Sequence, residues 1–85
     1  MTREELIWKI DHGDDIMFDV LGRHYAIFTW AFDEDGICIC EQNVSDSEKY
    51  FKTADELVDN YSIESFTLAS LAGQIKITDY TLAAN

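Results

Sequence analysis

Apolar side chains recur along the chain with two periods, and the change of period separates the predicted elements. Near the start, Leu6, Ile7 and Ile10 fall on one face of a helix, because residues three or four apart share a helical face. A T-x-x-E capping box opens this segment, so we predict a helix over 2–12. Gly13 follows at the position where many helices end in a left-handed residue.

The next thirty or so residues are rich in β-branched and aromatic side chains, interrupted by two turn signals. Gly22 and the Asp35-Gly36 pair mark the turns, because glycine reaches the positive φ that tight hairpins need. We predict an antiparallel meander with its second strand in the middle. The three strands are expected near 16–21, 23–32 and 37–42.

The predicted middle strand is apolar on both of its faces. One face carries Tyr25, Ile27 and Thr29, and the other carries Ala26, Phe28, Trp30 and Phe32. The first helix offers enough apolar residues to cover one sheet face, which leaves the other partly open. The candidate apolar interface, which could form a homodimer, therefore consists of Phe28, Trp30 and Phe32.

The faces of the third strand depend on the loop before it. A connection of two or four residues places Ile37 and Ile39 beside Trp30 and Phe32, since a shift of two preserves the strand period. The opposite face then carries Cys38, Cys40, Ala31 and Thr29.

The second half of the chain predicts shorter elements. A polar loop over 43–50 precedes a second T-x-x-E pattern and a helix over 54–60. Leu68 and Leu71 face inward on a further helical turn that stops at Gly73, and the alternating segment 74–80 predicts an edge strand. The fold class is α+β, a single domain over 1–85 in the order α-β-β-β-α-α-β: a small antiparallel sheet, made of the meander plus the edge strand, with two or three helices.

Charge is the unusual feature of the composition. Six Lys and Arg face 17 Asp and Glu, a net charge of −11. Such an excess repels nucleic acid and anionic membranes and attracts basic surfaces, so we expect neither direct nucleic-acid binding nor membrane binding. The first residues carry two glutamates and no unbroken apolar core, unlike a signal peptide, which predicts a cytoplasmic protein.

The stretch FDEDGICIC, at 32–40, combines carboxylates, a glycine and two thiols. Aligned as a calcium loop, it places Ala31 at the first ligand position and Gln42 at the twelfth, which excludes the EF-hand pattern. Cys38 and Cys40 form a C-x-C without the second pair of ligands that zinc sites use. We therefore expect a hairpin turn with two free thiols, no metal, no cofactor and no enzyme activity.

Clustered carboxylates are the best candidates for binding a basic partner. Carboxylates at alternate strand positions lie roughly 6.5–7 Å apart, and B-DNA presents about one charge per 3.4 Å along each strand, so an acidic face can imitate a phosphate track. Acidic residues also favour solvated turns and caps, which is the plainer interpretation. The candidate partner-binding residues are Asp33, Glu34, Asp35, Asp14, Asp15 and Glu41.

The opening MTREELIWKI, the meander and the short acidic helices resemble the small acidic anti-CRISPR proteins of phages and prophages. The stretch GRHYAIFTW is also similar to strands of uncharacterised small Firmicutes and prophage proteins. The first resemblance implies an inhibitor that occupies the DNA-binding groove of a type II CRISPR nuclease in a bacterial cytoplasm. The alternative is a protein–protein interaction module that uses its aromatic sheet face.

Overall fold

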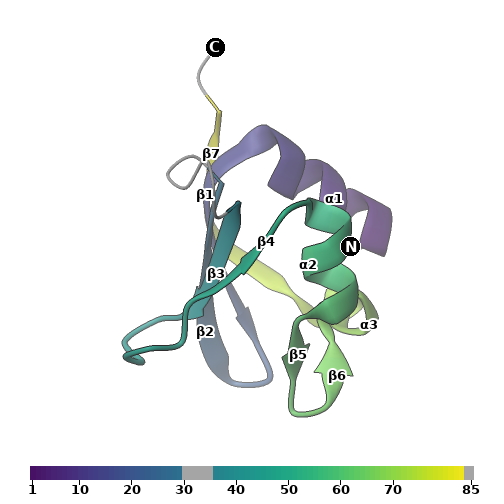
Figure 1. Cartoon of the computed structure of the whole chain (residues 1–85). Helices are drawn as coiled ribbons and strands as arrows, with labels where there is room; N and C mark the ends of the chain where they lie inside the picture. The colour runs from purple at the N-terminus through teal and green to yellow at the C-terminus, as the bar shows by residue number, and fades with distance from the viewer. Residues whose placement is uncertain (30–35, 84–85) are drawn as a thin grey trace.

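The helices that the structure describes all lie on one face of the sheet (Figure 1). The structure is a computed structural model and describes residues 1–29 and 36–83. The helices are α1 (Arg3–His12), α2 (Ala54–Asn60) and α3 (Leu68–Leu71), which continues into a 3-10 turn, η1 (Ala72–Gln74). The large sheet contains β1 (Gly13–Val20), β2 (Arg23–Phe28), β3 (Ile37–Glu41), β4 (Lys49–Phe51) and β7 (Lys76–Leu82). A small separate hairpin pairs β5 (Ser62–Ile63) with β6 (Phe66–Thr67).

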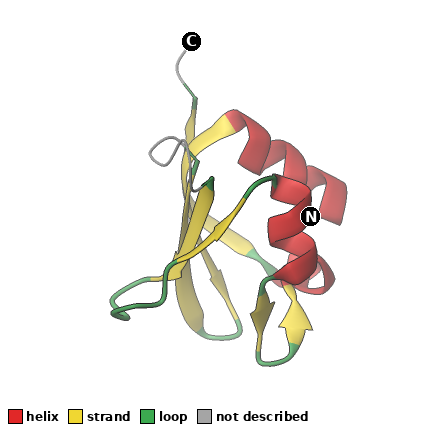
Figure 2. Cartoon of the chain, in the orientation of Figure 1, coloured by secondary structure: helices red, strands yellow, loops and turns green. Residues whose placement is uncertain are grey.

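The strand order of the large sheet is β4-β3-β2-β1-β7, and the printed pairs are all antiparallel. The predicted α+β class is confirmed, as the helices and strands in Figure 2 show. In the sheet β2 lies in the middle and β7 on the edge. Two strand elements were not expected from the sequence. β4 lies partly within the segment predicted as a loop, and the β5–β6 hairpin was not predicted.

The N-terminal helix begins at the predicted capping box. Thr2 Oγ1 accepts a hydrogen bond from the backbone N–H of Glu5 at 3.1 Å, and the Glu5 carboxylate accepts one from the N–H of Thr2 at 2.8 Å. The bond from the Thr2 backbone N–H to the Glu5 carboxylate, assisted by the Thr2 hydroxyl, holds the pKa of Glu5 below its ordinary value. Leu6 and Ile10 are fully buried against the sheet, as their spacing predicted.

Gly13 ends α1, but the prediction of a left-handed residue there is wrong. Its backbone is extended, with φ −101° and ψ 156°, because β1 begins at this residue. A Cβ at Gly13 would lie 2.8 Å from the carbonyl oxygen of Lys9 and 2.8 Å from the ring of Tyr80. The same ring donates its hydroxyl hydrogen to Lys9 O at 2.9 Å, so glycine permits close packing of α1 on β7.

The shorter helices follow the sequence closely. α2 has the predicted bounds, and Thr53 Oγ1 accepts from the N–H of Glu56 at 3.1 Å. The Glu56 carboxylate accepts from Lys52 N rather than from Thr53 N, so the second capping box is only half formed. Leu68 and Leu71 are buried on α3, as predicted.

Four aromatic rings connect the sheet to the end of α2; three of them lie in the buried core, and Phe51 packs against it half-buried. Phe18 stacks on Tyr25 with centroids 5.5 Å apart, and Tyr25 meets the edge of Tyr61 at 6.2 Å. Tyr61 in turn meets Phe51 of β4 at 6.4 Å. Burial of a large apolar side chain stabilises a fold by about 1.5–3 kcal/mol. Burial also raises the pKa of Tyr61 to about 12.

The predicted faces of the third strand are wrong. In the structure Ile27 pairs with Ile39 and Phe28 pairs with Cys38. An odd number of residues separates the two partners of each pair, whereas a loop of two or four residues would leave an even number between them. A change of register by one residue turns every side chain of the strand to the other face of the sheet. Ile39 is therefore fully buried in the helix-side core, and Ile37 packs against that core.

Gly36 and Gly22 both adopt the predicted positive φ, of 90° and 72°. Gly36 is the more demanding position, because a Cβ there would collide with the backbone carbonyl group of Phe51. We expect Gly36→Ala to lower the free energy of unfolding by about 2–4 kcal/mol, through left-handed strain and overpacking. Urea denaturation monitored by circular dichroism measures this change.

The matched control is Gly73→Ala. Gly73 lies in the 3-10 turn and has no heavy atom within 4 Å of a built Cβ. Its unfolding free energy is expected to stay within about 0.5 kcal/mol of the parent protein. Equal effects of the two substitutions would contradict the role given to Gly36.

Candidate binding site on the open sheet face

The sheet face opposite the helices, called here the open face, consists of three rows of neighbouring side chains. One row is Asp15, Phe28, Cys38 and Tyr50. The next row is Asp79, Met17, Ala26 and Cys40. The third row is Lys76, Asp19 and His24. The centre of the open face is thus apolar, and its margin carries three carboxylates, of Asp15, Asp19 and Asp79, together with Lys76 and His24.

The aromatic part of this face agrees with the expectation as far as the structure describes it. Tyr25 and Ile27 are buried under the helices, and Phe28 is half-buried on the open face. The other two residues of the predicted apolar interface, Trp30 and Phe32, lie outside the described residues.

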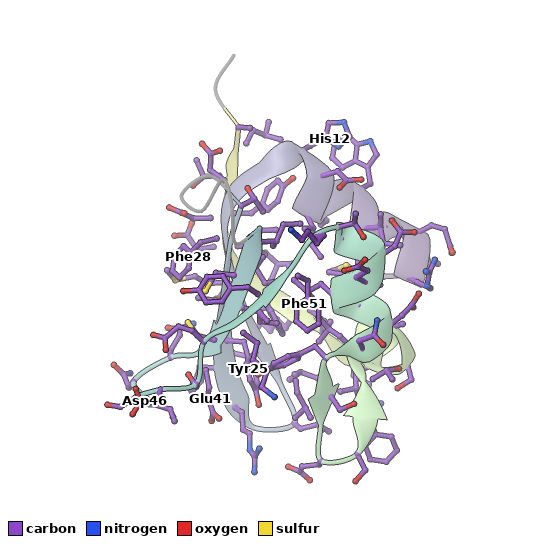
Figure 3. All side chains as sticks on the ribbon, in the orientation of Figure 1. His12, Tyr25, Phe28, Glu41, Asp46 and Phe51 are labelled. Atoms are coloured by element: carbon purple, nitrogen blue, oxygen red, sulfur yellow. The ribbon has the colours of Figure 1, made fainter. Side chains whose placement is uncertain are left out.

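A hollow of about 520 Å³ lies between the open face and the segment that connects β3 to β4. Met17, Ala26, Phe28 and Cys40 line it from the sheet. Glu41 lines it from the end of β3, and the residues at 42–45 and Glu48 line it from the connecting segment. In Figure 3 the connecting segment, with Asp46 at its tip, extends from the sheet on the side away from the helices. The volume is in the range of roughly 300–1,000 Å³ that ligand sites have, but the hollow is shallow and wide open to solvent, so it can cover one side of a bound group rather than enclose it.

Hydrogen bonds hold the connecting segment against the sheet. The side-chain amide of Gln42 donates to Tyr25 O at 2.8 Å, and its backbone N–H donates to His24 O at 2.8 Å. Ser47 Oγ accepts from Glu41 N at 3.0 Å and donates to Val44 O at 2.8 Å. One wall of the hollow is therefore built by specific bonds.

The two cysteines are free thiols on the open face. Cys38 is only 2% exposed, and Cys40 is half-buried in the wall of the hollow. Burial raises the pKa of both thiols, and the charge of Glu48 raises both further. A thiol with a raised pKa is a poor nucleophile at neutral pH. Within the described ranges, no three His, Cys, Asp or Glu side chains gather as metal ligands.

The three predicted acidic residues that the structure describes do not form one cluster. Asp14 and Asp15 lie within β1 rather than before it, and both are half-exposed at one end of the sheet. Glu41 lies at the end of β3, where it pairs with Tyr25 and borders the hollow. The remaining candidates, Asp33, Glu34 and Asp35, lie outside the described residues.

Sequence reasoning missed Glu48 and Asp19. Glu48 stands in the polar run before β4, where nothing in the sequence indicates that it faces the sheet. A hydrogen bond of 2.6 Å joins Oδ1 of Asp19 to Nδ1 of His24. The signal for Asp19 is the strand alternation, because Asp15, Met17 and Asp19 lie two residues apart in β1 and so share the open face.

On the helix side, carboxylates neutralise both arginines. Arg3 Nε and Nη2 donate to the two carboxylate oxygens of Asp59 at 2.9 and 2.7 Å, which raises the pKa of Arg3 and lowers that of Asp59. Arg23 lies 3.6 Å from Glu64. In the part of the chain that the structure describes, no ion pair includes Glu48.

Comparison with protein-family models, with curated proteins and with solved structures finds no match for this chain. Among the described helices, none has the length and apolar character needed to cross a membrane.

The thiol environment predicts slow chemical modification. In the native protein we expect iodoacetamide to react with both cysteines far more slowly than with the unfolded chain at pH 7, since the reactive thiolate is suppressed. Cys40 is expected to react before Cys38, because it is more exposed. Mass spectrometry of alkylation time courses from Cys38→Ser and Cys40→Ser variants separates the two sites. Reaction of either thiol at the unfolded rate would contradict the structure.

Proposed function

We propose that this chain is a non-enzymatic acidic protein that binds a basic protein surface and blocks the access of nucleic acid to it. The anti-CRISPR resemblance makes a type II RNA-guided nuclease the preferred partner. No individual contact residue comes from that resemblance, so the site assignments rest on this chain alone.

The observation that carries the proposal is the exposure of the acidic charge. None of the described acidic residues is buried, and the whole chain carries −11. Both arginines already lie beside carboxylates. The remaining negative potential favours association with a basic groove and disfavours contact with a phosphate backbone.

The two carboxylates at the end of the sheet are the strongest described anchors for such a groove. Asp14 and Asp15 are neighbours in β1, so their side chains point to opposite faces of the strand. Their backbone is fixed, because Thr29 N donates to Asp14 O at 3.0 Å and the Thr29 hydroxyl donates to Gly13 O. Because this backbone is already ordered, binding does not have to order it, which limits the entropy lost on association.

A second candidate function is a protein–protein interaction module that uses the apolar centre of the open face. The hollow favours it, because Met17 and Phe28 offer apolar surface beside an acidic margin. A homodimer through this face would bring two chains of charge −11 together, which opposes self-association at low salt.

The test is cleavage of target DNA by a panel of type II nucleases, with and without this protein. We expect inhibition of at least one nuclease, competition with duplex DNA that bears its recognition sequence, and weaker binding as salt rises, because exposed charges are screened over about 8–10 Å. Replacing Asp14 and Asp15 by Asn is expected to reduce the association rate several-fold, as is joint replacement of Asp33, Glu34 and Asp35 by their amides.

The matched control removes the same two charges elsewhere, by Asp46→Asn with Asp55→Asn, residues that are exposed on the connecting segment and on α2. This control should retain most of the association rate. No binding and no inhibition at micromolar protein across the panel would refute the nuclease partner. Equal effects of the site and control variants would refute the role of Asp14 and Asp15.

A further inference from the structure

We propose, resting on the function above, that the hollow receives one arginine or lysine side chain from the basic partner. The hollow would then act as an anchor pocket, while the surrounding acidic residues provide attraction at longer range. The apolar lining would contact the methylene groups of the basic side chain, and the carboxylate of Glu48 would attract its charged group.

The floor of the hollow matches the stem of a basic side chain. Met17, Ala26, Phe28 and Cys40 line it from the sheet, and none carries a charge. Arginine and lysine lay their methylene groups along apolar surface and keep the charged head in water. An aromatic residue in the lining, Phe28, also suits a cation, although its ring already has other contacts.

The mouth of the hollow matches the charged head. Glu48 lines the hollow, is exposed, and lies close enough to the sheet for its charge to raise the pKa of Cys38 and Cys40. No described basic residue forms an ion pair with it. The side chain of Gln42 directs its amide N–H to Tyr25 O, and its own carbonyl oxygen can accept a hydrogen bond.

Charge complementarity selects this occupant over the other candidates. A second copy of the chain brings a charge of −11 toward the same acidic margin. A purely apolar side chain would fit the floor but would bring Glu48 no counter-charge, and an anionic one would be repelled. A basic side chain suits both parts of the hollow, because its methylene groups match the apolar lining and its charge matches Glu48. A basic partner surface carries many such side chains.

The test uses the two methionines of the chain as reporters. Met17 lines the hollow, whereas Met1 packs against the helix-side core and serves as the internal control. The protein is labelled with ¹³C at the methionine methyl groups and titrated with N-acetyl-arginine amide and, separately, with N-acetyl-lysine amide. The neutral probe is N-acetyl-citrulline amide, which has nearly the shape of the arginine probe without its charge.

We expect both cationic probes to shift the Met17 methyl signal saturably, with a dissociation constant on the order of millimolar for a single side chain, and to leave Met1 unmoved. Citrulline is expected to bind at least about fivefold more weakly, and the arginine shift should weaken as salt rises. Glu48→Gln should reduce arginine binding at least about threefold, the loss expected from removing one exposed charge pair. Asp46→Asn removes a charge from the same segment outside the hollow lining, and should stay within about twofold of the parent protein.

Three results would overturn the proposal: equal binding of arginine and citrulline, no shift of Met17 at tens of millimolar probe, or equal affinity of the Glu48→Gln and Asp46→Asn variants. A heteronuclear spectrum of each variant checks that it is folded before titration. Because no nuclease enters this titration, its failure leaves the cleavage assay unaffected, and a negative cleavage assay leaves a positive titration standing.

Discussion

One-sided packing of the helices on the sheet is the constraint on which the rest of the structure depends. A chain of 85 residues can bury only about 60–65% of its unfolded surface, so it builds a single core. The rings of Phe18, Tyr25, Tyr61 and Phe51 tie β1, β2 and β4 to the end of α2, and the first three lie in that core. Because strand side chains alternate, every residue between two core positions must face the other way. The open face is therefore a direct consequence of how the core is made.

What the chain places on that second face distinguishes it from an ordinary solvated sheet. A typical antiparallel sheet turns polar residues outward, yet Met17, Ala26, Phe28 and the two cysteines lie at the centre here. The connecting segment between β3 and β4 adds a wall and the carboxylate of Glu48. An apolar floor with an acidic margin fits amphipathic cations, and the net charge works against self-association through the same face. The proposed binding of a basic side chain in the hollow depends on this combination, whereas the proposed function depends on the exposed acidic charge.

Local signals in the sequence predicted local structure well. The T-x-x-E pattern at Thr2, the bounds of α2 and the positive φ of Gly22 and Gly36 all depend on neighbouring residues, and the structure confirms them. Strand register and close packing could not be predicted from neighbouring residues, because they depend on contacts between distant parts of the chain. The odd spacing between β2 and β3 is fixed by burial of Ile39, and Gly13 is required by the ring of Tyr80, almost seventy residues later. The tip of the β5–β6 hairpin uses two non-glycine residues at positive φ, so it carried no turn signal. The hollow could not be predicted because it depends on that register.

The most direct test of the account is the accessibility of the open face in solution. A neutral gadolinium chelate broadens the signals of methyl groups that it can approach, and its lack of charge avoids bias from the acidic surface. At low protein concentration the account predicts strong broadening of the half-buried Met17 methyl and little broadening of Ile27 and Ile39, which are fully buried under the helices. Protection of Met17 equal to that of Ile27 at every protein concentration would show that the face is covered, and would contradict the account.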